Sequence, residues 1–112
     1  MFILALVLSG LALAAGAADK KVVLVAGRPS HPAGMHEFRA GSLLLQSCLA
    51  NVRGLTTFVY SNGWPENVAA LDGANAVIIY ADGCGGNPAI QGDHLEVLDA
   101  LAKKGVGLGF MH

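Results

Sequence analysis

Apolar and polar residues divide the chain into an uncharged leader and a longer segment of alternating pattern. All seven basic and all eight acidic residues follow Ala18, so residues 1–18 form an apolar block that ends in small residues. This block is typical of a secretory signal with cleavage after Ala17 or Ala18, although its start carries no lysine or arginine. We therefore expect an exported protein, periplasmic or extracellular. The alternative is an uncleaved membrane anchor, for which the block is at the short limit.

The segment from residue 19 to residue 112 alternates between short β-branched runs and helical spacing of apolar residues. It contains no repeat and no linker, which predicts one continuous domain segment. Strands are predicted over residues 22–26, 56–60, 76–80 and 106–110, and helices over residues 36–52, 66–71 and 93–104. The last helix begins with the capping pattern Asp93-x-x-Glu96 and ends in two lysines before a glycine.

This order of elements predicts an α/β fold. Strands separated by helices pair in parallel through right-handed crossovers, which gives an open doubly wound sheet of the flavodoxin-like type. The last strand runs to the end of the sequence with no helix to cover it. We therefore interpret residues 19–112 as the N-terminal part of a domain, truncated after the fourth strand.

Helical spacing also predicts which residues face the sheet. The first helix is expected to bury Phe38, Leu45, Cys48, Leu49 and Val52, and the last to bury Leu95, Leu98, Leu101 and Ala102. Because Cys48 lies on a helix and Cys84 in a glycine-rich loop, we expect two separate free thiols and no disulfide.

The charge of the chain argues against two classes of partner. A formal net charge of −1 gives no basic field for a nucleic acid and no acidic run for a cationic partner. The glycine-rich loop after the third strand lacks both the dinucleotide spacing and the lysine-serine ending of a phosphate-binding loop, so nucleotide binding is not expected either.

Functional side chains follow three of the predicted strands. His31, His36 and Glu37 come after the first strand, Asp82 after the third and His112 after the fourth. Ligands of open α/β sheets bind beyond the carboxyl ends of the strands, so neighbouring strands would bring these side chains together. Imidazoles and carboxylates hold divalent metals or exchange protons. All five are therefore candidate catalytic residues, and the three histidines are candidate metal ligands.

Each of these residues also has a purely structural interpretation. His36 and Glu37 can simply begin the first helix, with Glu37 near its positive end, and His31 can be an ordinary loop residue. An Asp-Gly pair forms turns, so Asp82 can bond only its own backbone. His94, just inside the last helix, is interpreted as a solvated residue.

Candidate substrate-binding residues are Arg28, Trp64 and Asp82. Trp64 offers an aromatic face to a sugar ring, but a tryptophan before proline is more often a packing residue under a turn. Arg28 can contact an anion, although a surface salt bridge is the simpler expectation for it, as it is for Arg39.

Five short sequence words carry a resemblance to a known family. In chain order they are VAGRPSH at residues 25–31, HEFRAG at 36–41, NGWP at 62–65, YADG at 80–83 and GVGLGFMH at 105–112. In these words the segment resembles the first part of the ThuA-like (trehalose utilisation) family, whose fold is similar to that of class I glutamine amidotransferases. The nucleophilic cysteine of the amidotransferases has no counterpart at or beside His112, so glutamine hydrolysis is not expected.

The resemblance implies an exported protein that acts on a small carbohydrate of the trehalose or keto-sugar type. Its enzymatic form would be a metal-assisted hydrolase or lyase with a divalent metal at the histidines. The alternative is a non-catalytic carbohydrate-binding module that uses Trp64, Tyr80 and Asp82, and metal dependence separates the two. A third interpretation is that the 112 residues are inactive alone because groups from later strands are missing.

Overall fold

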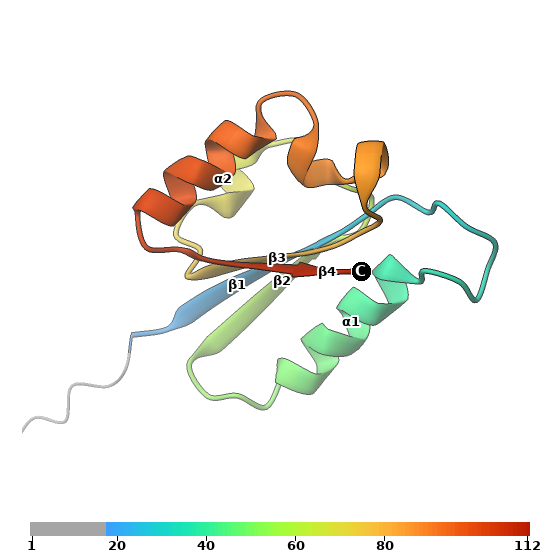
Figure 1. The fold of residues 1–112 in the computed structure, drawn as a ribbon. Coiled ribbons are helices and arrows are strands. Elements are labelled where there is room, and N and C mark those ends of the chain that lie inside the picture. The colour runs from blue at the N-terminus through green and yellow to red at the C-terminus, as the bar shows by residue number, and fades with distance from the viewer. Residues whose placement is uncertain (1–17) are drawn as a thin grey trace, which may run out of the picture.

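The computed structural model describes residues 18–112. The predicted signal over residues 1–18 therefore lies outside the described residues, apart from Ala18. The strands are β1 (Lys20–Ala26), β2 (Leu55–Tyr60), β3 (Ala76–Tyr80) and β4 (Gly107–Met111). The helices are α1 (Phe38–Leu49) and α2 (His94–Lys103), with short 3-10 helices η1 (Val68–Leu71), η2 (Cys84–Gly86) and η3 (Pro88–Ile90). Figure 1 shows their arrangement.

The four strands form one parallel sheet in the order β2-β1-β3-β4. Val23 of β1 lies opposite Phe58 of β2 on one side and Val77 of β3 on the other. On the far side of β3, Val77 lies opposite Leu108 of β4. The prediction of an open, flavodoxin-like parallel sheet is confirmed.

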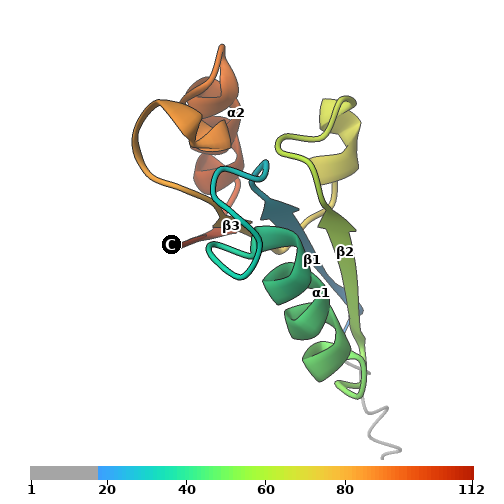
Figure 2. The same ribbon diagram turned by 90° about the vertical axis from the view of Figure 1, so that its right-hand side faces the viewer.

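The chain winds in two directions from β1, which places helices on both faces of the sheet. The connection from β1 to β2 carries α1 on one face, whereas η1 and α2, which precede β3 and β4, lie on the other (Figures 1 and 2). The strand order reverses between β1 and β3. In open α/β sheets this switch point is where ligands bind.

The main core lies between the sheet and α2. Its centre is a set of β-branched residues of β1 and β3 that are fully buried or nearly so: Val23, Val25, Val77 and Ile79. Leu71, which ends η1, and Leu98 and Leu101 of α2 cover them. Leu24 is also buried, so β1 is covered on both faces, as its continuous apolar run predicts.

Helix α1 is shorter than the predicted span 36–52 and buries only part of the predicted set of residues. It begins only at Phe38, because His36 takes a left-handed backbone conformation (φ 52°) that no helix continues. Phe38 is buried as predicted, and Leu45 and Leu49 are partly buried beside the buried Ser42. Cys48 is exposed and Val52 is 47% exposed, so their predicted burial is wrong.

Helix α2 matches its prediction in extent but not in detail. Leu98 and Leu101 are buried as predicted, whereas Leu95 is 57% exposed and Ala102 is also exposed. The side chain of Asp93 makes no capping hydrogen bond, so the predicted capping pattern is wrong.

Two smaller expectations can be compared with the structure. The helix predicted over residues 66–71 is the single 3-10 turn η1, whose first free amide, that of Ala69, donates to Asn67 Oδ1 (3.0 Å). Cys48 and Cys84 are both free and exposed, as expected. Within residues 18–112, no helix has the length and apolar character needed to cross a membrane.

Candidate functional site

The loops after β1 and β3, and His112 after β4, leave the sheet at one edge, beside the switch point (Figure 2). Backbone pairing continues just past the strands, because Gly27 N donates to Tyr80 O (2.8 Å) and Ala81 N donates to Met111 O (3.2 Å). Gly27 leaves no room for a side chain, since a Cβ there would lie 2.7 Å from that of Ala81. This tight contact fixes where the side chains that follow β1, β3 and β4 meet.

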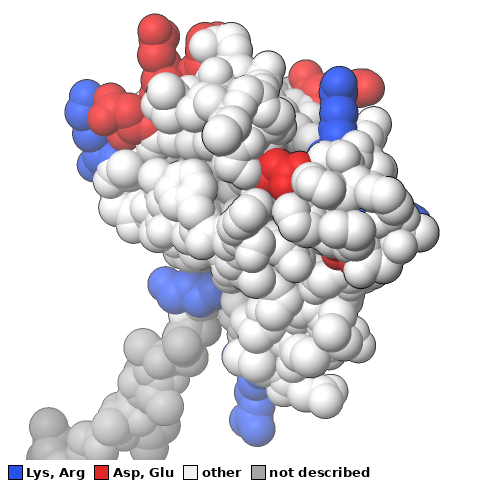
Figure 3. All heavy atoms as spheres, turned by 45° about the vertical axis from the view of Figure 1, so that its right-hand side comes forward, with Lys and Arg blue, Asp and Glu red and all other residues white. Residues whose placement is uncertain are grey.

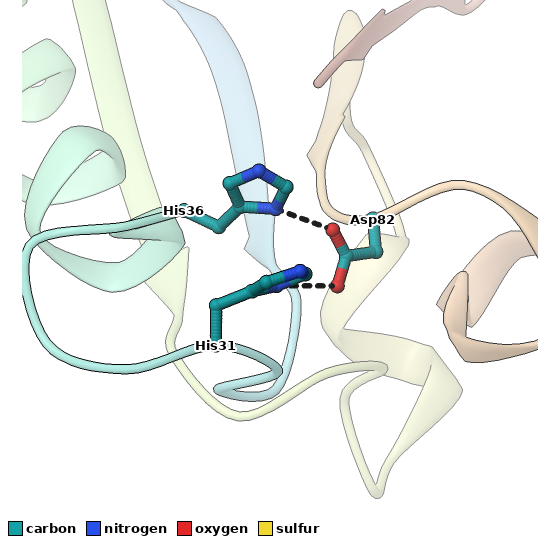
Figure 4. Close-up of side chains that lie close together, drawn as sticks. All are labelled: His31, His36 and Asp82. Carbon is teal, nitrogen blue, oxygen red and sulfur yellow. Dashed lines mark hydrogen bonds and ion pairs between the residues drawn. The ribbon is translucent and has the colours of Figure 1, made fainter.

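Asp82 is the centre on which three histidines converge. His36 Nδ1 donates a hydrogen bond of 2.6 Å to Asp82 Oδ1. His31 Nδ1 lies 3.6 Å from Asp82 Oδ2, and His112 Nε2 lies 3.5 Å from Asp82 Oδ1. Figure 4 shows the rings of His31 and His36 directed at the two carboxylate oxygens. Histidines from the loop after β1 and from the position after β4, up to 81 positions apart in numbering from 31 to 112, thus share one carboxylate.

The histidine rings also touch one another. The ring centroids of His31 and His36 are 4.0 Å apart, and those of His36 and His112 are 5.2 Å apart. His112 is the most exposed member, with 66% of its side chain accessible, whereas Asp82 is 19% exposed. The group is therefore open to solvent on the histidine side and partly enclosed around the carboxylate.

The surroundings of Asp82 keep its carboxyl ionised. Hydrogen bonding from the Ser30 hydroxyl is the largest influence that lowers the pKa of Asp82, and partial burial opposes it. The hydrogen bond from His36 and the charges of His31 and His36 lower this pKa further, so it falls below the ordinary value of 3.8. The Ser30 hydroxyl is also 2.9 Å from His31 Nδ1, which links it to the same group.

The loop between β1 and α1 holds His36 in an unusual backbone conformation. A positive φ is uncommon for a residue with a side chain and tends to occur where the surroundings fix a functional geometry. Glu37 stabilises this loop, because its Oε1 accepts a 2.6 Å hydrogen bond from Gly34 N. Glu37 thus stabilises the loop through its carboxylate, which does not join the histidine group around Asp82.

The donor set of this group fits a divalent transition metal. One ligand atom from each of His31, His36 and Asp82 can be chosen so that all lie within 4.8 Å of one another. Tetrahedral zinc with bonds of about 2.1 Å separates its ligand atoms by roughly 3.4 Å. The distances of 3.5 and 3.6 Å from Asp82 to His112 and His31 are close to that separation. The 2.6 Å between His36 Nδ1 and Asp82 Oδ1 is shorter than that separation, so these two atoms would move apart to hold a metal together.

A cleft of about 610 Å³ begins at Asp82 and is not lined by His31, His36 or His112. Its walls come from the loops after β1, β2 and β3, and its polar and aromatic lining residues are Arg28, Ser30, Trp64, Glu66, Asp82, Gln91 and His94. The volume lies within the ~300–1,000 Å³ typical of small-molecule sites. Asp82 belongs both to the histidine group and to the cleft, so a ligand in the cleft could reach the histidine group through this residue.

The structure places both arginines outside ion pairs. Arg28 lines the cleft, and neither Arg28 nor Arg39 forms a salt bridge with any of residues 18–112, so the expected surface salt bridges are wrong. Trp64 is partly buried against the core and also lines the cleft. Tyr80 instead packs edge-on against Phe38 (5.2 Å between centroids) and is not part of the cleft wall.

The sequence does not predict Ser30, Gln91 or His94 as site residues. The interpretation of His94 as a solvated residue is wrong, because its ring stacks on Trp64 with centroids 4.2 Å apart and planes 9° apart, and it lines the cleft. Its position could have indicated this, because His94 opens the helix that follows the loop after β3, at the carboxyl edge of the sheet.

Charged side chains are few and scattered on the face shown in Figure 3, and most of that face is uncharged. No family model, curated protein or solved structure matches the chain. The function proposed below therefore rests on the chemistry of the described side chains and on the resemblance in sequence words.

Proposed function

We propose that this protein binds a divalent metal through His31, His36 and Asp82, with His112 as a further ligand or proton carrier, and acts on a small carbohydrate. The reaction is a metal-assisted hydrolysis or lyase reaction. The observation that supports this most directly is the convergence of three histidines on one carboxylate that also lines a cleft.

The residues of the group divide naturally into holding and proton-transferring roles. A bound divalent metal supplies a Lewis acid that polarises a substrate oxygen or lowers the pKa of water. Asp82, ionised and partly enclosed, neutralises the charge of the metal, and His31 and His36 complete its ligands. His112 is more exposed and 3.5 Å from Asp82, so its imidazole is free to exchange a proton with a substrate.

The carbohydrate part of the proposal rests on two supports. The sequence words resemble those of the ThuA-like family, which implies a sugar of the trehalose or keto-sugar type. In addition, Trp64 forms part of the cleft wall. The uncharged block over residues 1–18 supports the export of the protein to the periplasm or the exterior.

A non-catalytic carbohydrate-binding role is the second candidate. The observation in its favour is that Trp64 and Asp82 line the cleft together. Tyr80, the third residue expected in such a site, does not contribute to the cleft wall, which weakens this alternative. Sugar binding without any bound metal would support it.

Elemental analysis of the purified chain tests the metal site. We expect close to one equivalent of zinc or a similar divalent ion in the wild type, and none after His31→Ala or Asp82→Asn. Asp99→Asn is the matched control, because Asp99 is an exposed carboxylate that pairs only with Lys103 on α2. Wild-type protein that retains no metal after purification and dialysis against zinc would contradict the proposal.

A further inference from the structure

We infer that His94 and Gln91 form a second recognition site in the same cleft, which accepts hydrogen bonds from the hydroxyl groups of a neutral carbohydrate. The inference rests on the proposed function for its ligand class, but it concerns residues outside the histidine group. His94 and Gln91 would then be specificity-determining residues, which bind the part of the substrate that lies farthest from the metal.

The tautomer of His94 is set by its neighbour. His94 Nδ1 lies 2.6 Å from the carbonyl oxygen of Pro88, and a carbonyl oxygen can only accept, so Nδ1 carries the proton. In the neutral imidazole this leaves a lone pair on Nε2. Nε2 has no hydrogen-bond partner among residues 18–112 and is not among their enclosed unpaired atoms. It is therefore an acceptor within reach of solvent, on a residue that lines the cleft.

The plane of the His94 ring is fixed as well. The ring stacks on Trp64 at 4.2 Å and 9°, and Trp64 itself packs against the core beneath the cleft. With one nitrogen bonded to the backbone and one face against an indole, His94 cannot turn without losing both contacts. Its acceptor is thus preorganised, which lowers the entropy cost of binding a ligand hydroxyl.

Gln91, between η3 and α2, is held in a similar way. Its side-chain nitrogen donates to the carbonyl oxygen of Gly85 and, more weakly, to that of Asn87 (3.4 Å). Its remaining polar atom, Oε1, is an acceptor and has no partner among residues 18–112. Both side chains of this wall therefore use their donors on backbone carbonyls and keep their acceptors for a ligand.

The rest of the lining indicates which ligand would suit these acceptors. Asp82 and Glu66 add two carboxylates, whereas Arg28 is the single cationic side chain of the wall. Two carboxylates against one guanidinium give the wall a negative balance of charge, which disfavours anions, and the acceptors of His94 and Gln91 favour molecules with O–H donors. An apolar sugar face can also lie against the aromatic pair of Trp64 and His94. These features select a neutral, hydroxyl-rich ligand over a sugar phosphate.

The substitution His94→Asn isolates the proposed acceptor. An asparagine side chain can place its nitrogen near the position of Nδ1, so it can keep the hydrogen bond to Pro88 O while Nε2 is removed. His94→Gln does the reverse, because its terminal amide lies near the position of Nε2. We expect the affinity for trehalose, measured by calorimetry, to fall about tenfold in His94→Asn, as for one lost hydrogen bond, and to fall less in His94→Gln. Thermal unfolding of both variants should stay close to that of the wild type.

Trp64 provides an independent signal for the wild type. It is the only tryptophan of the chain, so its fluorescence reports on this wall of the cleft alone. Trehalose should change the emission with saturation, whereas inorganic phosphate should not. The inference is overturned if wild-type protein does not bind trehalose, if phosphate binds in its place, or if His94→Asn binds trehalose as the wild type does.

The two proposals can fail separately in this experiment. If His94→Asn keeps the zinc content of the wild type but binds trehalose more weakly, both proposals are supported. Trehalose binding that depends on His94 in a protein without metal would leave this inference standing and remove the metal site. Loss of zinc in His94→Asn would overturn the inference, because His94 would then support the histidine group and not a separate site.

Discussion

The two ends of the parallel sheet use polar side chains in opposite ways. At the amino end, Lys21 N donates to Asn75 Oδ1 (2.8 Å), and Lys21 Nζ donates to the carbonyls of Ala70 and Asp72 (2.9 and 2.8 Å). At the carboxyl end, Asp82 gathers three histidines at 2.6 to 3.6 Å, and the adjoining cleft is lined by acceptors without protein partners.

The difference separates polar residues that hold the fold from those available to a ligand. At the amino end Lys21 bonds Asn75 and the carbonyls of Ala70 and Asp72, and its ammonium lies 5.2 Å from the centre of the Phe58 ring, so it anchors η1 and β2 to β1. At the carboxyl end the polar groups crowd one another, and His36 adopts a backbone conformation that costs energy. Substitutions at the two ends should therefore affect different properties.

The largest expected effect is on metal affinity. His36→Ala removes a ligand, so zinc affinity in calorimetric titration should fall by more than the ~10–100-fold that loss of an outer-shell partner causes. The free energy of unfolding of the metal-free protein should change by no more than about 1.5 kcal/mol, the value of one hydrogen bond. Similar zinc affinities of variant and wild type would show that His36 is not a ligand.

The next largest effect is expected on the free energy of unfolding, from a substitution at Gly27, where the loop after β1 begins. Gly27→Ala would place a Cβ 2.7 Å from that of Ala81 and 3.3 Å from the ring of Phe38, so β1 and β3 must shift. We expect a loss of about 1–3 kcal/mol in chemical unfolding, as for overpacked cores. Gly83→Ala is the control, because nothing lies within 4 Å of its added Cβ. Equal stability of the two variants would contradict the proposed crowding.

A smaller loss of stability is expected at the amino end. Lys21→Met keeps most of the aliphatic chain but removes the two hydrogen bonds to the carbonyls of Ala70 and Asp72. Because these bonds are partly exposed, we expect a loss of about 1–2 kcal/mol in chemical unfolding. Zinc and trehalose binding should be unchanged. The matched control is Lys20→Met, and a ligand-binding defect in Lys21→Met would break the distinction between the two ends.

The smallest effect is a pH dependence of the metal-free protein. The pKa of Asp82 is lowered in the folded state, so its ionised carboxylate contributes stability that is fully present above the unfolded pKa near 3.8 and is lost as the pH falls through the folded pKa. Asp82→Asn should lack this component. Thermal unfolding of both proteins on either side of pH 3.8 should show a steeper acid loss for the wild type, and parallel curves would contradict the shift.

Strands and their order follow from the sequence because β-branched runs fix them locally. Residues 76–80 are predicted and observed as one strand, and β1 and β2 extend their predictions by one or two residues. The convergence of His31, Asp82 and His112 follows from the same pattern, since parallel neighbours end at one edge. Local periodicity and the rules of sheet topology are sufficient for this part of the site.

The remaining features depend on contacts that no short pattern encodes. The ring of Tyr80 lies where Gly41 of α1 has no side chain, and spacing of apolar residues cannot reveal that fit. The role of Glu37 depends on the loop bringing Gly34 N within 2.6 Å. His94 was missed because its partner Trp64 comes from a different loop, thirty positions earlier in the numbering.

X-ray absorption spectroscopy of the zinc-loaded chain tests the central claim most directly. The account predicts a first shell of nitrogen and oxygen at about 2.0–2.1 Å with imidazole scattering from at least two histidines, and loss of one imidazole in His36→Ala. A shell of water oxygens alone, or one that contains sulfur from a cysteine, would contradict a metal site at Asp82.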